Sequence, residues 1–188
     1  MSVNSDRYRR AIDGFGEVVA AAPPDRWDAP SPCTEWTARD VVGHLLAVLH
    51  AIVATIDGRR APMNPMKNPG RHAGADPVAA WSAAHDALVA AIAEPGVLDR
   101  IVPTWRGDVT VDDMLGYSVG DATIHTWDLA RAVGADDRLD PDLVEASLAA
   151  VTPLADSMRE LDAVGPAVAV PDDADAQQRL LAVMGRTT

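Results

Sequence analysis

The sequence has a single cysteine, Cys33, so an intrachain disulfide is excluded, and with it the small disulfide-dense scaffolds of secreted proteins. The first residues, MSVNSDRYRR, lack the apolar core of a secretory signal. No stretch reaches the roughly 18 consecutive apolar residues that a membrane span needs. We therefore expect a cytoplasmic protein that does not enter a membrane.

Positive charge is also scarce. Lys and Arg number 16 against 28 Asp and Glu, for a formal net charge of −12. Nucleic-acid binding requires a basic face, and docking on an anionic membrane also requires positive charge. The balance argues against both partners and leaves small molecules open. Aromatic residues are only 4% of the chain, whereas hydrophobic residues, mostly Ala and Val, are 48%, a composition typical of packed helices.

Apolar periodicity and capping residues predict a mainly helical chain. Thr37 with Asp40 has the pattern of an N-cap and its capping-box partner. The expected helices cover residues 5–22, 37–56, 76–94, 110–133 and 140–160, with a short one near 174–184 and an extended piece around 101–102. We predict an all-α fold in one domain over residues 1–188, with a four-helix bundle over about 1–160 and a short C-terminal extension over about 161–188.

Residues 59–75 interrupt this pattern with a segment rich in Pro, Gly and Asn. A connection this long without secondary structure is unusual in a compact domain and often serves as a lid or a binding loop. A floppy linker fits the composition equally well, so the role of this segment stays open at the level of sequence.

Three polar residues at helical spacing are candidate metal ligands. Asp121 and His125 are four residues apart and project from adjacent turns of one helix face, while His44 lies on the inward stripe of helix 37–56. Two imidazoles and one carboxylate suit zinc, nickel or ferrous iron, and three protein ligands leave a position for water or substrate. The alternative is a hydrogen-bonded core histidine beside a structural Asp–His ion pair. A buried, unpaired Asp121 would cost about 1–3 kcal/mol, so it needs a partner.

Asp128 follows His125 by three residues and has two roles open to it. It could orient the imidazole of a ligating histidine, or it could pair with Arg131 on the helix flank. Of these roles, the pair with Arg131 on the helix flank is favoured.

Cys33 is disfavoured as a ligand. His44 lies seven residues beyond Thr37, roughly 10 Å up the helix at about 1.5 Å per residue, so we expect Cys33 to be a buried structural thiol. Trp36 and Trp127 are expected to pack the ends of the bundle, with stacking on a substrate as the less favoured role. His72, in the long loop, is expected to be solvated.

Three segments carry a family resemblance: PSPCTEWTARDVVGHLL, IHTWDLARAVG and VPDDADAQQRLLAVMGR. Together they resemble the actinobacterial branch of the DinB-like superfamily, whose named relatives are the mycothiol-dependent maleylpyruvate isomerases. The resemblance covers nearly the whole chain. It implies a four-helix bundle that holds a divalent metal, usually zinc, through a His on the second helix and an acid-x-x-x-His pair on a later one. By position these are His44, Asp121 and His125.

Two differences from the isomerases stand out. Those enzymes carry a larger C-terminal domain that helps to form the active site, whereas about fifty residues follow helix 110–133 here. The acid is Asp121, where the isomerase pattern favours Glu. Since Asp is one methylene shorter, a metal would have to lie closer to its helix. Both differences bear on isomerase activity more than on metal binding.

The resemblance implies a metal-dependent enzyme that uses a low-molecular-weight thiol such as mycothiol, an S-transferase or isomerase with an unknown second substrate. The metal would hold the sulfur at the open position and lower its pKa. The alternatives are a metal-dependent hydrolase, with water at that position, and a helical binding module with a structural metal. A non-haem iron oxygenase is disfavoured because its HxD spacing and β-barrel are absent. Monomer and homodimer both stay open.

Overall fold

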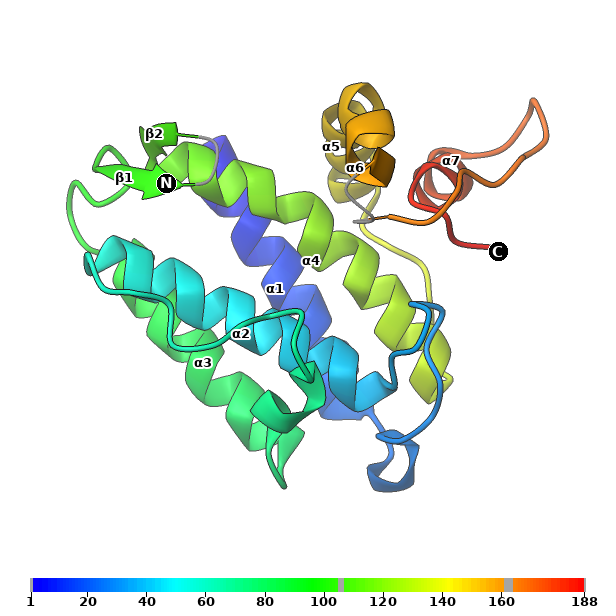
Figure 1. The fold of residues 1–188 in the computed structure, drawn as a ribbon, viewed down its shortest axis with the longest axis horizontal. Coiled ribbons are helices and arrows are strands. Elements are labelled where there is room, and N and C mark those ends of the chain that lie inside the picture. The colour runs from blue at the N-terminus through cyan, green and yellow to red at the C-terminus, as the bar shows by residue number, and fades with distance from the viewer. Residues whose placement is uncertain (1, 105–106, 161–163, 188) are drawn as a thin grey trace.

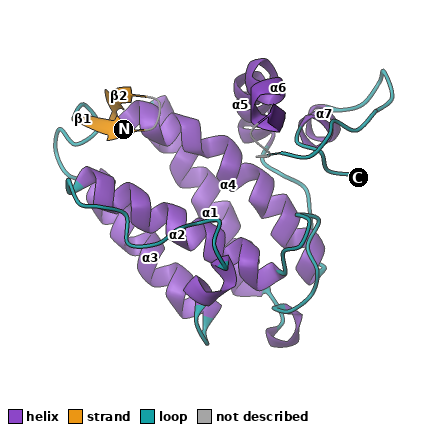
Figure 2. Ribbon diagram, in the orientation of Figure 1, coloured by secondary structure: helices purple, strands orange, loops and turns teal. Residues whose placement is uncertain are grey.

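The computed structural model describes residues 2–104, 107–160 and 164–187 (Figure 1). These residues are mostly helical, with one small antiparallel hairpin, which confirms the predicted all-α, DinB-like fold (Figure 2). The four long helices are α1 (Val3–Ala21), α2 (Ala38–Ile56), α3 (Pro77–Ile92) and α4 (Val111–Val133). Their inward faces supply one large hydrophobic core that includes Phe15, Leu45, Leu88 and Leu115.

The helices α1 and α4 run in the same direction and make the most extensive contact in the molecule. Near their starts, the Asn4 side-chain amide donates to the Asp112 carboxylate at 3.1 Å. At the other end, Arg26, which follows α1, donates from its guanidinium to the carbonyl of Ala132 in the last turn of α4 at 3.1 Å. Helix α2 packs against both α3 and α4.

The predicted capping pairs fix where these helices begin. The Thr37 hydroxyl accepts from the Asp40 amide, and the Asp40 carboxylate accepts from the Thr37 amide, so the capping box of α2 is complete. Helix α4 ends at Val133 and is followed by Gly134, whose φ of 78° is in the left-handed region that glycine favours. Local sequence therefore sets the registers of the two helices that carry the candidate ligands.

The prediction of one continuous helix over residues 140–160 is wrong. The structure has α5 (Pro141–Val151), a 3-10 turn η3 (Thr152–Leu154) and α6 (Ala155–Glu160). Pro153 lacks the backbone N–H that a continuing helix needs, and its ring crowds the preceding turn, so the helix is interrupted there.

The last helix, α7 (Ala176–Val183), lies close to the range predicted for it. It packs with α5, which in turn packs on α4, and in Figure 1 it lies beside α5 and α6. The buried residues there form a second hydrophobic cluster, made of Ile124, Trp127, Val144, Val151, Leu180, Leu181 and Met184. Helix α4 thus has one face in each cluster, and the C-terminal segment is attached to the helix that carries Asp121 and His125.

The loop after α2 has more structure than its composition suggested. Residues Pro69–Ala73 form a 3-10 helix, η2, that lies on α2. The contact is so close that a Cβ on Gly43 would be 2.0 Å from the Pro69 carbonyl oxygen. The Gly70 amide also donates to the Asp40 carboxylate at 2.9 Å. A floppy connection is therefore the wrong interpretation of this part of the loop.

The extended piece predicted around residues 101–102 is one arm of a two-stranded hairpin. Strands β1 (Ile101–Thr104) and β2 (Gly107–Thr110) pair antiparallel, with Ile101 opposite Thr110. The hairpin leads directly into α4, whose N-cap is Thr110.

Among the described residues, α2 is the one helix whose length and composition would suffice to cross a membrane, with a mean hydropathy of 1.5. Most of that stretch, 61%, is buried inside the protein. It also carries His44 at the centre of the fold, so its apolar character is accounted for by the core.

Candidate metal centre

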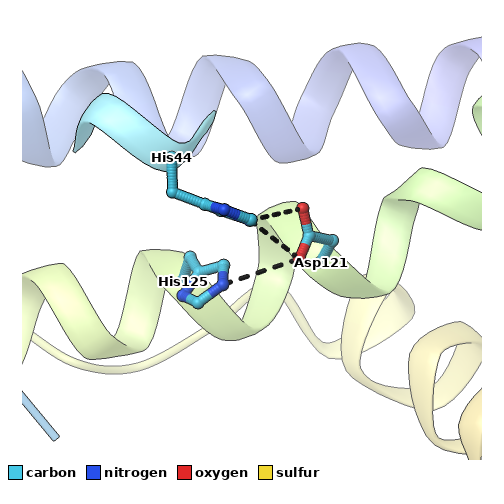
Figure 3. A group of neighbouring side chains, drawn as sticks. All are labelled: His44, Asp121 and His125. Atoms are coloured by element: carbon cyan, nitrogen blue, oxygen red, sulfur yellow. Dashed lines mark hydrogen bonds and ion pairs between the residues drawn. The ribbon is translucent and has the colours of Figure 1, made fainter. Parts of the chain in front are cut away.

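The structure brings the three predicted ligand residues together (Figure 3). His44 Nε2 lies 3.3 Å from Asp121 Oδ2 and 3.4 Å from Oδ1, and His125 Nε2 lies 3.5 Å from Asp121 Oδ1. One nitrogen from each imidazole and one carboxylate oxygen all lie within 4.8 Å of one another. The helical spacing on α4 and the inward stripe on α2 therefore converge as the sequence predicted.

A backbone carbonyl orients the His44 ring. Its Nδ1 lies 3.1 Å from the carbonyl oxygen of Pro65, in the loop that follows α2. Because a carbonyl only accepts hydrogen bonds, Nδ1 must carry the proton, and in the neutral ring Nε2 then presents a lone pair. That lone pair points toward the Asp121 carboxylate. The loop over residues 59–75 therefore reaches the His44 ring through the Pro65 carbonyl.

His125 is oriented in the same way by Asp128. The Asp128 carboxylate lies 2.9 Å from His125 Nδ1 and is fully buried. The prediction that Asp128 pairs with Arg131 is wrong. Arg131 points outward, pairs with Asp137 at 3.2 Å and lies over the Trp127 ring. The helix turn carries Asp128 inward, on the side of the C-terminal segment, so it cannot reach the exposed flank.

Exposure differs sharply within the group of three. Each histidine side chain is only 8% exposed, whereas the Asp121 side chain is 38% exposed. The imidazoles are therefore surrounded by protein, and the Asp121 side chain is the part of the group that solvent reaches. Among the three residues, Asp121 marks the side from which water or a small molecule could enter.

The charges in the group are strongly coupled. Desolvation alone would raise the pKa of Asp121, but His44 and His125 beside it lower the pKa to about 2. For His44 the two effects have the opposite signs. Burial lowers its pKa, whereas the Asp121 carboxylate and the hydrogen bond to Pro65 raise it, and the net pKa is raised. The centre therefore holds a fixed negative charge and favours a positive charge between its ligand atoms.

Trp36 covers the two imidazoles. Its ring centroid lies 5.0 Å from that of His44 and 5.7 Å from that of His125, with the second pair nearly parallel. The expectation that Trp36 packs a bundle end missed this, because only the folded chain places the loop before α2 over the site. Trp127 is buried in the C-terminal cluster, away from these rings.

The remaining candidates lie outside the cluster of ligand atoms. Cys33, expected to be a buried thiol, is half-buried and does not belong to the group of ligand atoms, and burial raises the pKa of its thiol to about 11. His72, expected to be solvated, is half-buried and contacts the Asn64 carbonyl at 3.2 Å. Sequence reasoning missed the Pro65 carbonyl and the partner that Asp128 finds in Arg186, since no local pattern links these positions.

Comparison with known proteins gives two kinds of match. The model of the family described as the mycothiol maleylpyruvate isomerase N-terminal domain matches residues 8–130, which include all three clustered residues. Two uncharacterized proteins of Mycobacterium tuberculosis, one from strain CDC 1551 / Oshkosh and one from strain ATCC 25618 / H37Rv, are each 33% identical over 147 residues. The aligned part is 78% of this chain and 76% of each relative. No solved structure matches.

Proposed function

The chain belongs to the mycothiol maleylpyruvate isomerase N-terminal domain family, and on that premise we propose that it is a metal-dependent enzyme acting on a low-molecular-weight thiol. The thiol is mycothiol or a close chemical relative, and the reaction is an S-transfer or an isomerisation with a second small substrate. His44, Asp121 and His125 are the metal ligands, and zinc is the preferred ion, with nickel or iron also suited to this ligand set.

One observation carries the metal assignment. The Nδ1 atoms of both histidines are committed to acceptors, the Pro65 carbonyl and the Asp128 carboxylate, so in the neutral rings both Nε2 atoms present lone pairs. These lone pairs face the Asp121 carboxylate at 3.3 and 3.5 Å. Electron-rich atoms at such distances repel unless a cation or proton lies among them. The residues present therefore fit a divalent ion in ligand type, tautomer and approach.

The open side of the centre supports an exchangeable ligand. Three protein ligands leave a four-coordinate ion one position short, as in catalytic zinc sites. Asp121 is the most exposed of the three, so an outside ligand would approach a bound ion from its side. When bound, such an ion would supply the Lewis acidity that lowers the pKa of a thiol held there. Trp36 shields the imidazoles from solvent and keeps their rings in place.

The thiol has to come from outside the chain. Cys33 is the sole cysteine, and burial keeps its pKa at about 11, so it stays protonated near neutral pH. It also lies outside the group of ligand atoms. The mycothiol named in the family description is the obvious candidate, because the matched segment is the one that carries the centre.

Calorimetry tests the proposal. A thiol that binds at the ion sheds its proton, so mycothiol should bind zinc-loaded protein with a net release of protons, measured in buffers of different ionisation enthalpy. The His44→Ala variant is the matched control and should show no release. Binding without proton release would favour a hydrolase, in which the open position keeps water. No binding of any small thiol would favour a binding module with a structural metal.

A further inference from the structure

Arg186 reaches from the C-terminal segment to the buried side of α4. Its Nη2 lies 2.7 Å from Asp128 Oδ2 and its Nε lies 3.3 Å from Asp128 Oδ1. The Arg186 side chain is only 10% exposed and that of Asp128 is fully buried. This is a two-pronged ion pair in the interior, a geometry that a guanidinium can form and an ammonium cannot.

The same carboxylate holds His125. Asp128 Oδ2 accepts from His125 Nδ1 at 2.9 Å as well as from Arg186 Nη2. Because the guanidinium engages both oxygens, the carboxylate plane cannot rotate, and Oδ2 stays aimed at the imidazole. Arg186, which lies 58 positions after Asp128 in the chain, therefore sets the orientation of the His125 ring through Asp128.

The end of α7 is built to present this guanidinium. Gly185 has a φ of 78°, and a Cβ there would lie 2.8 Å from the Gly165 Cα, so a glycine is needed at this turn. The next amide, that of Arg186, donates to the Leu181 carbonyl at 2.8 Å. Arg186 Nη1 also donates to the Met184 carbonyl at 2.8 Å. These backbone and side-chain hydrogen bonds hold the guanidinium in place independently of its contact with Asp128.

We propose that Arg186 is a positioning residue of the metal centre, and that the C-terminal segment completes the centre by holding Asp128 and, through it, His125. The inference rests on the proposed metal site and deepens it. It assigns the segment after α6 a role in metal affinity besides that of covering α4.

The test compares zinc affinity, measured by competition with a chromophoric chelator, in the wild type and three variants. Arg186→Met removes the pair with Asp128, whereas Arg186→Lys keeps the charge and loses the two-pronged contact. Arg159→Met is the matched control, because Arg159 donates to the Val183 carbonyl at 2.9 Å and so tethers the same segment without touching Asp128. The visible spectrum of each cobalt-loaded protein reports the ligand geometry.

We expect Arg186→Met to bind zinc about tenfold more weakly, the lower end of the effect of residues that orient ligands. Arg186→Lys should fall between this variant and the wild type, with an altered cobalt spectrum, and Arg159→Met should match the wild type. If Arg186→Met does not fold, Arg186→Lys decides. Affinities within twofold of wild type in both Arg186 variants would overturn the inference, as would an equal loss in Arg159→Met. A wild type that binds no zinc rejects the proposed metal site itself.

Discussion

His44 Nε2 lies 3.3 Å from Asp121 Oδ2, although the two residues are 77 positions apart in the chain. One is on α2 and the other on α4, and the contact of these helices places them face to face (Figure 3). The proton of the His44 ring is engaged on its other nitrogen by Pro65. In the neutral ring the Nε2 lone pair then faces the carboxylate. The metal assignment depends on this relationship, and four predictions follow the account of the centre.

The first prediction concerns metal content. Protein purified without chelator should carry close to one equivalent of a divalent ion, and His44→Ala should remove most of it, because Asp121 and His125 on one helix seldom hold a metal tightly alone. Asp121→Asn should weaken binding by removing the anionic ligand. Elemental analysis measures the content. His50→Ala is the control, since His50 is on the same helix but outside the ligand cluster. Absence of metal, with no uptake of added zinc, would reject the site.

The second prediction concerns Asp128. Asp128→Asn removes the charged acceptor that holds His125 Nδ1, so zinc affinity should fall about 10- to 100-fold. Arg131→Ala should leave the affinity unchanged, because Arg131 pairs with Asp137 on the surface. Competition titration of both variants distinguishes the two roles. An unchanged zinc affinity in Asp128→Asn would contradict the orienting role and favour the alternative in which Asp128 does not hold His125.

The third prediction concerns the packing of the loop on α2. Gly43→Ala forces a Cβ against the Pro69 carbonyl oxygen, so the loop must shift, and the free energy of unfolding should fall by about 1–3 kcal/mol. The zinc affinity should fall as well, since the same loop holds His44 through Pro65.

Gly14→Ala is the matched control for that substitution. Gly14 is inside α1, and a Cβ there meets nothing within 4 Å. Alanine is the better helix former, so this variant should gain about 0.5–1 kcal/mol. Urea unfolding of both variants measures the difference. Equal stability of Gly43→Ala and wild type would show that the loop does not hold the close position described here.

The fourth prediction concerns removal of the metal. An ion that binds only the folded chain stabilises it by mass action, by about 2.7 kcal/mol at a hundredfold excess over Kd. Zinc should therefore raise the Tm of metal-free wild type, and a chelator should lower it again. The His44→Ala variant should not respond to either. A zinc response of equal size in this variant would place the stabilising ion elsewhere.

Much of the helical framework could be predicted because its signals are local. Thr37 and Asp40 cap α2 within one turn, and Asp121 and His125 share a face of α4 by spacing alone. Pro153 is also a local signal, because its missing N–H interrupts the helix predicted over residues 140–160.

The partners of the candidate ligands could not be predicted in the same way. Pro65 acts through its backbone carbonyl, which every residue has, so its side chain carries no signal of the role. Arg186 meets Asp128 because the second hydrophobic cluster docks α7 on α4, a tertiary event with no local pattern. Asp128 lies one helix turn after His125 and is buried, whereas Arg131 pairs with Asp137 on the surface, so the predicted pair with Arg131 is wrong.

The most direct test of a thiol-binding metal centre is a titration of cobalt-loaded protein with mycothiol, followed by absorption. If the thiol sulfur enters the open position beside Asp121, a sulfur-to-cobalt charge-transfer band should grow to saturation, and His44→Ala loaded under the same conditions should lack it. Simpler thiols at high concentration should give the same band more weakly. A cobalt spectrum that mycothiol leaves unchanged would contradict the thiol chemistry proposed for His44, Asp121 and His125.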